Sequence, residues 1–412
     1  MTFLLRISTI IGMSRLINRP AYLAKLHGFK NMQLVKAVTG VRRCGKSTLF
    51  KLFQADLKRN GISSEQIIEI NLEDADYVHL LGWKNLHDHI KQRLLPGKMN
   101  YIFLDEIQQV ENFPKTINSL RILDNVDLYV TGSNAYMFSG KIMTLLGGRY
   151  VEIRMLPLSF AEYMQAFPEA DPSRKYKDYL EQSSFPQTLE FHGNKQLIHD
   201  YLDGLYNTIV RRDVLLRKGM KDSSQFENIA RFLFDNIGCE TSTKKIADSM
   251  TSAGRKISVH TVESYISALT DSYILYRAGR FDIKRKQYLK TGHKYYIVDP
   301  GLRCFLLGSQ IGDEGRVLEN VVFLELCRRG YEVSFGKIDN VEVDFVAIKG
   351  GAPVYFQIAM TTRDQSTMER ELRPLNNIHD HYPKFLITMD DDPPAVYNGI
   401  HRINVLDWLL ED

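Results

Sequence analysis

Cysteine is scarce in this chain of 412 residues, which contains four. The four are Cys44, Cys239, Cys304 and Cys327, and no two of them form a Cys-x-x-Cys pair. The pattern therefore predicts neither a disulfide framework nor a zinc site. Isolated thiols of this kind are typical of proteins kept in a reducing compartment, so we expect a cytoplasmic protein.

The sequence also lacks a hydrophobic run of about 20 residues, the length that a membrane span needs. The apolar stretch from Met1 to Gly12 is interrupted by Arg6, and no small-residue cleavage site of a secretory signal follows it. We therefore expect no membrane attachment. Met13 is an alternative start of translation, which would leave the preceding residues as a loosely attached extension.

A strong excess of charge of either sign is missing as well. The net charge is +4, with 44% hydrophobic and 25% charged residues, which is the composition of a globular protein. Whole-molecule electrostatics therefore says little about partners, and local clusters must be considered instead. The length predicts two or three domains.

What the sequence does contain is a P-loop. A β-prone run from Leu34 ends in Gly40, and Gly45, Lys46 and Ser47 then begin a helix that continues through Phe53. This strand, loop and helix are the context that the pattern G-x-x-x-x-G-K-[ST] requires. The predicted nucleotide-binding residues are Gly40, Val41, Arg42, Arg43, Cys44, Gly45, Lys46, Ser47 and Thr48.

The residue types of this loop suit ATP and Mg²⁺. Gly40 and Gly45 allow a sharp turn in which successive N–H groups point at phosphates, and the helix N-terminus adds partial positive charge. Lys46 would reach the β- and γ-phosphates, and the Ser47 hydroxyl would bind Mg²⁺. The alternative is a glycine-rich turn that binds nothing.

A second nucleotide element lies on a predicted strand that begins at Asn100. Four apolar or aromatic residues precede Asp105 and Glu106, which is a Walker B pattern. The Asp105 carboxylate would hold Mg²⁺, and Glu106 would act as the general base toward water. The alternative is an acidic pair that merely ends a buried strand.

Predicted strands and helices alternate through this part of the chain. After the P-loop helix we expect a strand at 66–72, a helix at 83–94, and strands at 100–106 and 126–134. Alternation of this kind predicts an α/β fold with a doubly wound parallel sheet and a ligand site at the carboxyl ends of its strands. Ser133 or Asn134 would then sense the γ-phosphate or orient the water, or would form a plain polar turn.

Arg149 follows a Gly-Gly turn and precedes a predicted fifth strand at 150–154. An arginine held in this way can act as an arginine finger or as a sensor of the γ-phosphate. The competing interpretation is a solvated surface arginine. The sequence does not decide whether Arg149 acts in its own chain or in a neighbouring copy.

Together these motifs resemble those of archaeal and bacterial AAA+-type ATPases with a C-terminal restriction-endonuclease-like domain of unknown function. The resemblance is carried by G-V-R-R-C-G-K-S-T, L-D-E-I-Q, T-G-S-N-A, G-G-R-Y and L-P-L-S-F-A-E-Y. It implies a P-loop sheet of the ASCE type, with an extra strand between the P-loop and Walker B strands. It also implies Gly-Gly before Phe185-Pro186, where this chain has Ser183-Ser184.

A helix-turn-helix pattern follows the helical segment 158–222, which we interpret as a lid and connector. It runs from Ile246 through Gly254 to Leu269, and two predicted strands after it, 273–278 and 294–298, complete a winged helix. Seven Lys or Arg and one acid lie between Arg277 and Lys294, so the presumed wing is basic. Double-stranded DNA and an unidentified protein are the two partners that this module could contact.

The order of elements after residue 311 resembles the PD-(D/E)xK nuclease fold. Glu319 matches its helical acid and Asp344 its strand acid, but the expected acid and lysine that follow are replaced by Gln357 and Ala359. Lys349 is the one nearby cation, and its place on a turn argues against a catalytic role. We therefore expect a binding domain that does not cleave DNA.

The sequence as a whole predicts an Mg²⁺-ATP-dependent ATPase that transmits its nucleotide state to a winged helix and a nuclease-like domain. A nucleotide-gated binding switch with little turnover and an active ATP-dependent nuclease are the alternatives. Oligomerisation and the biological partner stay open. The expected divisions are 1–18 for an extension, 19–157 for the ATPase core, 158–222 for the lid, 223–310 for the winged helix and 311–412 for the nuclease-like domain.

Overall fold

The computed structural model describes residues 16–135, 145–210, 214, 223–308 and 313–411. Contacts divide the chain into one unit of residues 1–157 and 271–273 and a second unit of 158–270 and 274–412. The segments expected to form a lid, a winged helix and a C-terminal domain lie in the second unit, except for residues 271–273 of the expected winged helix, which belong to the first. The alternative start at Met13 lies outside the described residues.

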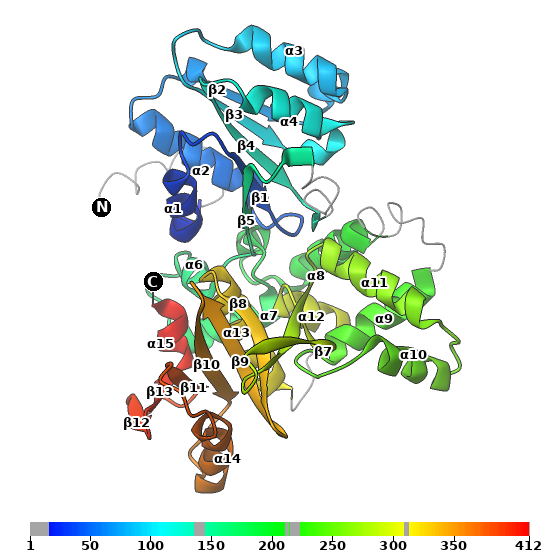
Figure 1. Ribbon diagram of the computed structural model, residues 1–412, viewed down its shortest axis with the longest axis vertical. Helices are drawn as coiled ribbons and strands as arrows, with labels where there is room; N and C mark the ends of the chain where they lie inside the picture. The colour runs from blue at the N-terminus through cyan, green and yellow to red at the C-terminus, as the bar shows by residue number, and fades with distance from the viewer. Residues whose placement is uncertain (1–15, 136–144, 211–213, 215–222, 309–312, 412) are drawn as a thin grey trace. The chain divides into compact units, whose positions relative to one another are not determined.

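The first unit contains a five-stranded parallel sheet with the order β2-β3-β4-β1-β5 (Figure 1). This confirms the predicted doubly wound parallel sheet. The strand between the P-loop strand β1 and the Walker B strand β3 is β4, whereas the second predicted strand, β2, which we expected in that place, lies at the edge of the sheet. Because all strands are parallel, their carboxyl ends meet at one edge. The strands are β1 (Val35–Thr39), β2 (Ile67–Asn71), β3 (Asn100–Asp105), β4 (Val126–Gly132) and β5 (Tyr150–Arg154).

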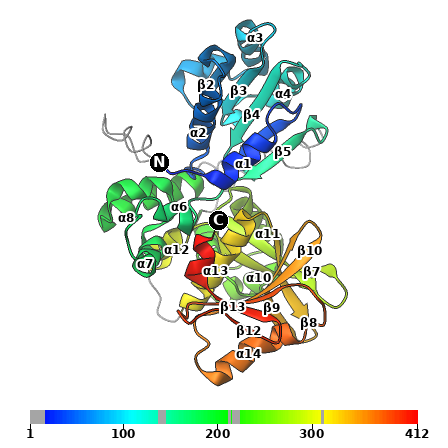
Figure 2. The same cartoon turned by 90° about the vertical axis from the view of Figure 1, so that its left-hand side faces the viewer.

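Helices cover both faces of this sheet (Figures 1 and 2). Side chains alternate along β3, so Ile102 and Leu104 join the core on one face, while Phe103 points to the other. There the Phe103 ring packs against Phe50 and Tyr129, with ring centroids 5.1 and 4.8 Å away. The helices are α1 (Pro20–Gly28), α2 (Lys46–Arg59), α3 (Trp83–Arg93) and α4 (Phe113–Arg121), with short 3-10 turns η2 (Ser64–Gln66), η3 (Ala75–Leu80) and η4 (Ile107–Gln109).

The second unit is built around an eight-stranded mixed sheet with the order β12-β13-β11-β10-β9-β8-β6-β7. The hairpin β6–β7, expected as a wing, pairs in parallel with β8 and so continues the C-terminal sheet. The strands are β6 (Leu275–Asp282), β7 (Gln287–Ile297), β8 (Glu332–Ile338), β9 (Val341–Lys349), β10 (Ala352–Ala359), β11 (Lys384–Thr388), β12 (Ala395–Tyr397) and β13 (Ile400–Asn404).

Helices of the second unit include the two that the helix-turn-helix pattern predicts, α10 and α11, with Gly254 at φ 79° between them. On the sheet, α13 packs the Phe323 ring against Tyr296 of β7, with centroids 4.1 Å apart. The helices are α6 (Phe160–Met164), α7 (Pro172–Gln182), η6 (Pro186–Phe191), α8 (Lys195–Thr208), α9 (Ser223–Asp235), α10 (Thr243–Ser252), α11 (Val259–Asp271), α12 (Pro300–Leu307), α13 (Glu314–Arg328), α14 (Gln365–Asn376) and α15 (Val405–Leu410).

The turn where the resemblance implies Gly-Gly has an unusual backbone. Ser183 has φ 82° and ψ 151°, a combination that is almost restricted to glycine. The next residue, Ser184, donates its backbone N–H and its hydroxyl to Asp299 Oδ2 at 2.7 and 2.6 Å. The turn thus keeps a glycine-like conformation although a serine occupies it.

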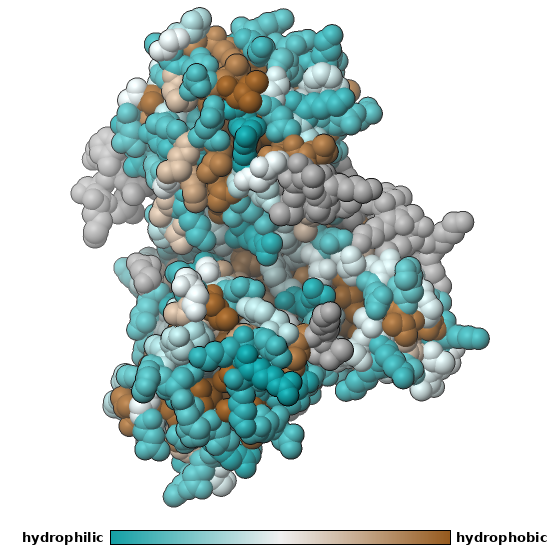
Figure 3. Space-filling model, viewed as in Figure 1, coloured by the Kyte–Doolittle hydropathy of each residue, from teal (hydrophilic) through white to brown (hydrophobic). Residues whose placement is uncertain are grey.

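The visible surface of each unit is mostly hydrophilic, with smaller apolar areas between the polar side chains (Figure 3). Most large apolar side chains are instead buried in the cores. Among the described residues, none of the helices combines the length and the apolar character that crossing a bilayer requires.

Candidate nucleotide-binding site

The P-loop connects the carboxyl end of β1 to the N-terminus of α2. Its backbone uses left-handed conformations at Arg43 (φ 64°) and Gly45 (φ 103°). Gly40 has φ 152°, and a Cβ atom there would lie 2.1 Å from the carbonyl oxygen of Met155. Gly40 therefore has no room for a side chain, which explains why the loop requires glycine at this position.

Lys46 is the first residue of α2, and its side chain is buried. Its ammonium donates to the carbonyl oxygens of Gly40 at 3.1 Å and Val41 at 3.2 Å. The same ammonium lies 3.6 Å from a carboxylate oxygen of Glu106. The Lys46 ammonium therefore lies between the P-loop carbonyl oxygens and Glu106. In this position it can exchange these contacts for contacts with phosphate oxygens.

The predicted metal ligands Ser47 and Asp105 lie next to each other. The Ser47 hydroxyl donates to Asp105 Oδ2 at 2.5 Å, and Thr131 donates to the other carboxylate oxygen. Burial raises the pKa of Asp105, although both hydrogen bonds oppose that rise. A hydroxyl and a carboxylate are hard oxygen ligands of the type that Mg²⁺ binds, so these two residues fit the metal.

Glu106 follows the end of β3 with a left-handed backbone, φ 53°. Its N–H donates to Thr131 Oγ1 at 2.8 Å, and its Oε2 accepts from Ser133 at 2.9 Å and from Gln108. Burial would raise the pKa of Glu106, but the Lys46 ammonium and these hydrogen bonds together lower it below its usual range. Glu106 is therefore ionised and oriented, as a general base must be.

Three residues of the site were missed by sequence reasoning. Thr131 bridges the two acids, and Gln108 orients Glu106 from the turn that follows it. Arg19 is buried and donates to the carbonyl oxygens of Cys44 at 3.2 Å and Leu156 at 2.7 Å, so it supports the P-loop from outside. The motif T-G-S-N could have pointed to Thr131, but no local signal marks Arg19.

The other predicted residues occupy the same edge of the sheet. Val41 and Cys44 are fully buried and form the inner side of the loop, whereas Arg43 is exposed. Arg42 donates to Glu73 at 3.0 Å. Asn134 is buried just beyond the end of β4, beside the Ser133 that contacts Glu106. The structure thus brings together the P-loop, Walker B and β4 residues that the sequence predicted.

Arg149 is the predicted site residue that the structure does not bring to this edge within one chain. It precedes β5, where Tyr150 pairs with Val35 and Arg154 pairs with Thr39. Arg149 is therefore at the amino end of the sheet, about 16 Å along the strand from the P-loop. Arg149 therefore cannot sense a γ-phosphate bound in its own chain, because the P-loop lies at the carboxyl end of the sheet. A role toward a neighbouring copy remains a proposal.

A second cluster of charged side chains surrounds Lys294 in the second unit. The ammonium is buried and lies 3.0 Å from Glu319 of α13 and 2.8 Å from Glu342 of β9. Burial alone would lower the pKa of Lys294, but Glu319, Asp344 and Glu342 raise it above its usual value. Lys294 is therefore a charged group that neutralises part of this acidic cluster.

Asp344 of β9 is the second acid that matches the nuclease pattern. Its Oδ2 accepts from the Ile358 N–H at 2.8 Å, and burial together with repulsion from Glu319 raises its pKa. Gln357, where the pattern has an acid, donates its amide to Glu371 at 2.9 Å. Among the described residues, no group of three or more His, Cys, Asp or Glu is arranged to hold a metal ion.

Two family models match parts of the chain. Residues 33–164 match the family described as "AAA domain", and residues 173–311 match "Domain of unknown function (DUF8612)". The Walker-type ATPase of Pyrococcus abyssi, a solved structure, aligns with 71% of this chain and 96% of its own at a TM-score of 0.50. Its sequence identity is 15%, so this likeness shows the fold alone.

Two relatives of unestablished function match most of the chain. An "Uncharacterized protein MJ1544" of Methanocaldococcus jannaschii is 29% identical over 359 residues, 82% of this chain and 77% of the relative. An "Uncharacterized protein" of Haemophilus influenzae is 37% identical over 401 residues, 96% of this chain and 99% of the relative. The chain therefore belongs to the same family as the Haemophilus influenzae protein, and its first unit carries an AAA-type P-loop ATPase domain.

Proposed function

We propose that this protein hydrolyses ATP in an Mg²⁺-dependent reaction and uses the nucleotide state to control its second unit. The observation that carries the proposal is the convergence of Lys46, Ser47, Asp105 and Glu106 at the carboxyl edge of one parallel sheet. A phosphate-binding loop, hard oxygen ligands and an ionised carboxylate are the parts that phosphoryl transfer to water needs.

Each residue has a distinct role in this proposal. The P-loop N–H groups and Lys46 bind the phosphates, and Glu106 accepts a proton from the attacking water. Ser47 and Asp105 would hold Mg²⁺, which supplies positive charge next to the phosphates. Thr131, Ser133 and Gln108 fix the orientation of the two acids through the hydrogen bonds described above.

The proposal is tested by replacing Lys46 with alanine. Because the ammonium is a preorganised contact to the reacting phosphate, its loss should lower phosphate release by about 100-fold or more. Lys51→Ala is a matched control, since Lys51 lies on the same helix but is exposed. Equal rates of phosphate release from the two variants would contradict the assignment of the site.

A switch that binds ATP with little turnover is the second candidate. It is supported by the contacts of Glu106, whose carboxylate is engaged by Ser133, Gln108 and Lys46 and so is restrained. The two candidates differ in turnover and not in binding. A wild-type protein that binds ATP but releases phosphate in hours would favour the switch. Capture of partners by Glu106→Gln, which should hold bound ATP, would then identify what the switch controls.

We further propose that the second unit contacts double-stranded DNA through α10, α11 and the β6–β7 hairpin. The hairpin turn carries exposed Lys284 and Arg285, and the segment between the two helices carries exposed Arg255 and Lys256. Asp339 neutralises part of this basic surface, since one of its carboxylate oxygens lies 2.7 Å from the Lys284 ammonium. A protein partner is therefore the competing occupant.

Simultaneous charge reversal of Lys284, Arg285 and Lys286 distinguishes a DNA partner from a protein partner. Reversal should weaken duplex binding most at low salt. The variant makes fewer phosphate contacts than the wild type, so its binding releases fewer counterions and depends less steeply on salt. A matched control reverses the three exposed basic residues of α3, Lys84, Lys91 and Arg93. No duplex binding at low salt, or equal binding by both triple variants, would favour protein docking.

We propose that the C-terminal part of the second unit binds without cutting DNA. Gln357 contributes no negative charge, Ala359 offers no cation, and the Lys294 ammonium already neutralises Glu319. Supercoiled and linear DNA incubated with the protein, Mg²⁺ or Mn²⁺ and ATP should remain intact. Nicking that is lost in Asp344→Ala but persists in Lys46→Ala would overturn this proposal and favour an ATP-dependent nuclease.

A further inference from the structure

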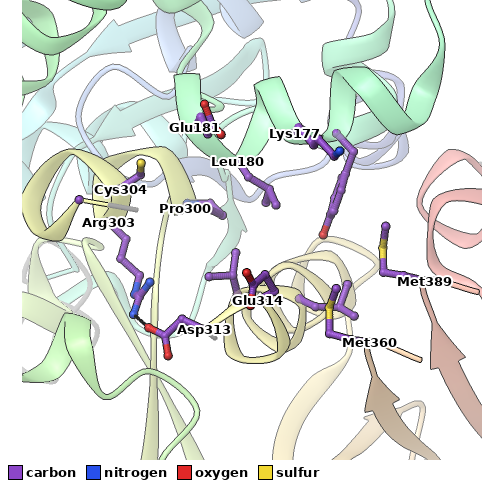
Figure 4. Close-up of a pocket in the computed structure, with 14 residues that line it drawn as sticks. Lys177, Leu180, Glu181, Pro300, Arg303, Cys304, Asp313, Glu314, Met360 and Met389 are labelled. Carbon is purple, nitrogen blue, oxygen red and sulfur yellow. Dashed lines mark hydrogen bonds and ion pairs between the residues drawn. The ribbon is translucent and has the colours of Figure 1, made fainter. Parts of the chain in front are cut away.

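The second unit contains a cavity of about 370 Å³ between α7, α12 and α13 and the ends of two strands (Figure 4). Leu180, Val317 and Leu318 contribute apolar side chains to it, as do Met360 and Met389. The last two lie on the same side in Figure 4, joined by a backbone hydrogen bond of 3.2 Å. The volume lies in the range of small-molecule sites, and methionine side chains adapt readily to different apolar shapes.

A buried hydroxyl in the described part of the lining has no hydrogen-bond partner. Tyr176 of α7 is 4% exposed and lines the cavity, and its hydroxyl is buried without a hydrogen bond in the described structure. Burial raises the pKa of Tyr176, so the hydroxyl stays neutral and can donate. By contrast, Tyr179 on the same helix donates to the Leu158 carbonyl at 2.9 Å. Buried hydroxyls normally have a hydrogen-bond partner, so we infer that a ligand supplies the acceptor for Tyr176.

The charged groups around the cavity favour a neutral ligand. The Arg303 guanidinium pairs with Asp313 and donates to the Phe234 carbonyl at 2.8 Å, so its charge is already compensated. Lys177 and Glu181, which Figure 4 places on the α7 side, are exposed to solvent and of opposite sign. Glu314 of α13 also lines the cavity, and it too is exposed to solvent. The buried part of the lining therefore offers mainly apolar contacts together with the Tyr176 hydroxyl.

We propose that this cavity binds a small, neutral, mostly apolar molecule that presents one carbonyl oxygen to the Tyr176 hydroxyl. The hydroxyl supplies orientation, and the surrounding Leu, Val and Met side chains supply contact area. Such a ligand would connect α7 with α13, the helix that also carries Glu319. The cavity contains none of the nucleotide-site residues, so its ligand would not compete with ATP for the same residues.

Two probes of nearly the same shape test the proposal in the full-length protein. Propiophenone carries a carbonyl oxygen, and propylbenzene lacks it. Calorimetry or ligand-observed NMR should show that the wild type binds propiophenone about tenfold more tightly, the effect of one neutral hydrogen bond. Tyr176→Phe should bind both probes equally. The control Tyr179→Phe should keep the preference, because that hydroxyl is already paired within the chain.

The location of the site is tested by filling the cavity from two different helices. Leu180→Trp on α7 and Val317→Trp on α13 should each abolish binding of both probes, while circular dichroism and thermal melting confirm that at least one variant is folded. Absence of propiophenone binding to the wild type would overturn the proposal. So would a tenfold preference that persists in Tyr176→Phe, or binding that survives in a folded filled variant.

Discussion

Replacement of Lys294 by methionine tests how the acidic cluster of the second unit is held together. The ammonium is buried, and it forms ion pairs of 3.0 Å with Glu319 and 2.8 Å with Glu342. Methionine would fill most of the volume but would leave Glu319, Glu342 and Asp344 without their cation. Removing one partner of a buried ion pair typically costs about 3–5 kcal/mol, so we expect a loss of that order in the free energy of unfolding.

The loss should depend on pH. Burial and Glu319 already raise the pKa of Asp344, and loss of the Lys294 cation, which opposes that rise, should raise it further, so the folded state binds more protons. Stability is then retained at low pH and lost as the pH rises from the unfolded pKa through the raised folded pKa. The penalty of Lys294→Met should therefore be clearly larger at pH 8 than at pH 5. Asp344, whose pKa is already raised in the wild type, gives the parent protein a slope of the same sign.

Tryptophan fluorescence makes the measurement specific for the second unit. The chain has two tryptophans, Trp83 in the first unit and Trp408 in the second, so urea unfolding in a Trp83→Phe background reports Trp408 alone. Lys349→Met is the matched control, because Lys349 is exposed and donates to the Arg329 carbonyl. A loss below about 1 kcal/mol, or equal losses at pH 5 and pH 8, would refute the reasoning.

Three further predictions concern other parts of the chain. Charge reversal of Lys284, Arg285 and Lys286 should reduce the slope of log binding constant against log salt by up to about 2.7, as filter binding across a salt series would show; an unchanged slope would contradict DNA contact there. Arg149→Ala should lower ATP turnover by about 10³-fold if it is a finger in trans, and mixing with the P-loop lysine variant should restore part of the activity in phosphate-release assays; no restoration would remove that role. Ser183→Gly should be more stable than Ser183→Ala by about 1 kcal/mol in urea unfolding, because the backbone at φ 82° is glycine-like; equal stability would show that the turn relaxes.

The sequence predicted the first unit well because its central strands, β1, β3 and β4, are short, mostly apolar runs that are buried on both faces. Strands β2 to β5 begin and end within about two residues of their predicted positions. The helix α4 was missed, since Phe113–Arg121 is short and contains Pro114 at its start. Strand β12 was missed for a similar reason, because three residues at a sheet edge carry little periodic signal.

The candidate site was predictable where its residues are adjacent in sequence. Lys46 and Ser47 share one motif, and Asp105 and Glu106 share another, so each spacing could be recognised directly. Lys294 and Arg19 could not be found in this way, because their partners come from distant segments that only the folded chain brings together. For Lys294 these partners are Glu319 and Glu342, on a helix and on a neighbouring strand. The pairing of the expected wing could not be found for the same reason, since β6 pairs with the distant strand β8 and so adds the hairpin to the edge of the C-terminal sheet.

The most direct test of the central claim is ATP turnover by Glu106→Gln at saturating ATP and Mg²⁺. The amide keeps the shape of the side chain but cannot accept the proton of the attacking water, so turnover should fall by about 10²- to 10⁴-fold while ATP binding is retained. Glu111→Gln, a control at an exposed acid nearby, should hydrolyse ATP like the wild type. Turnover by Glu106→Gln at the wild-type rate would contradict the account of this site.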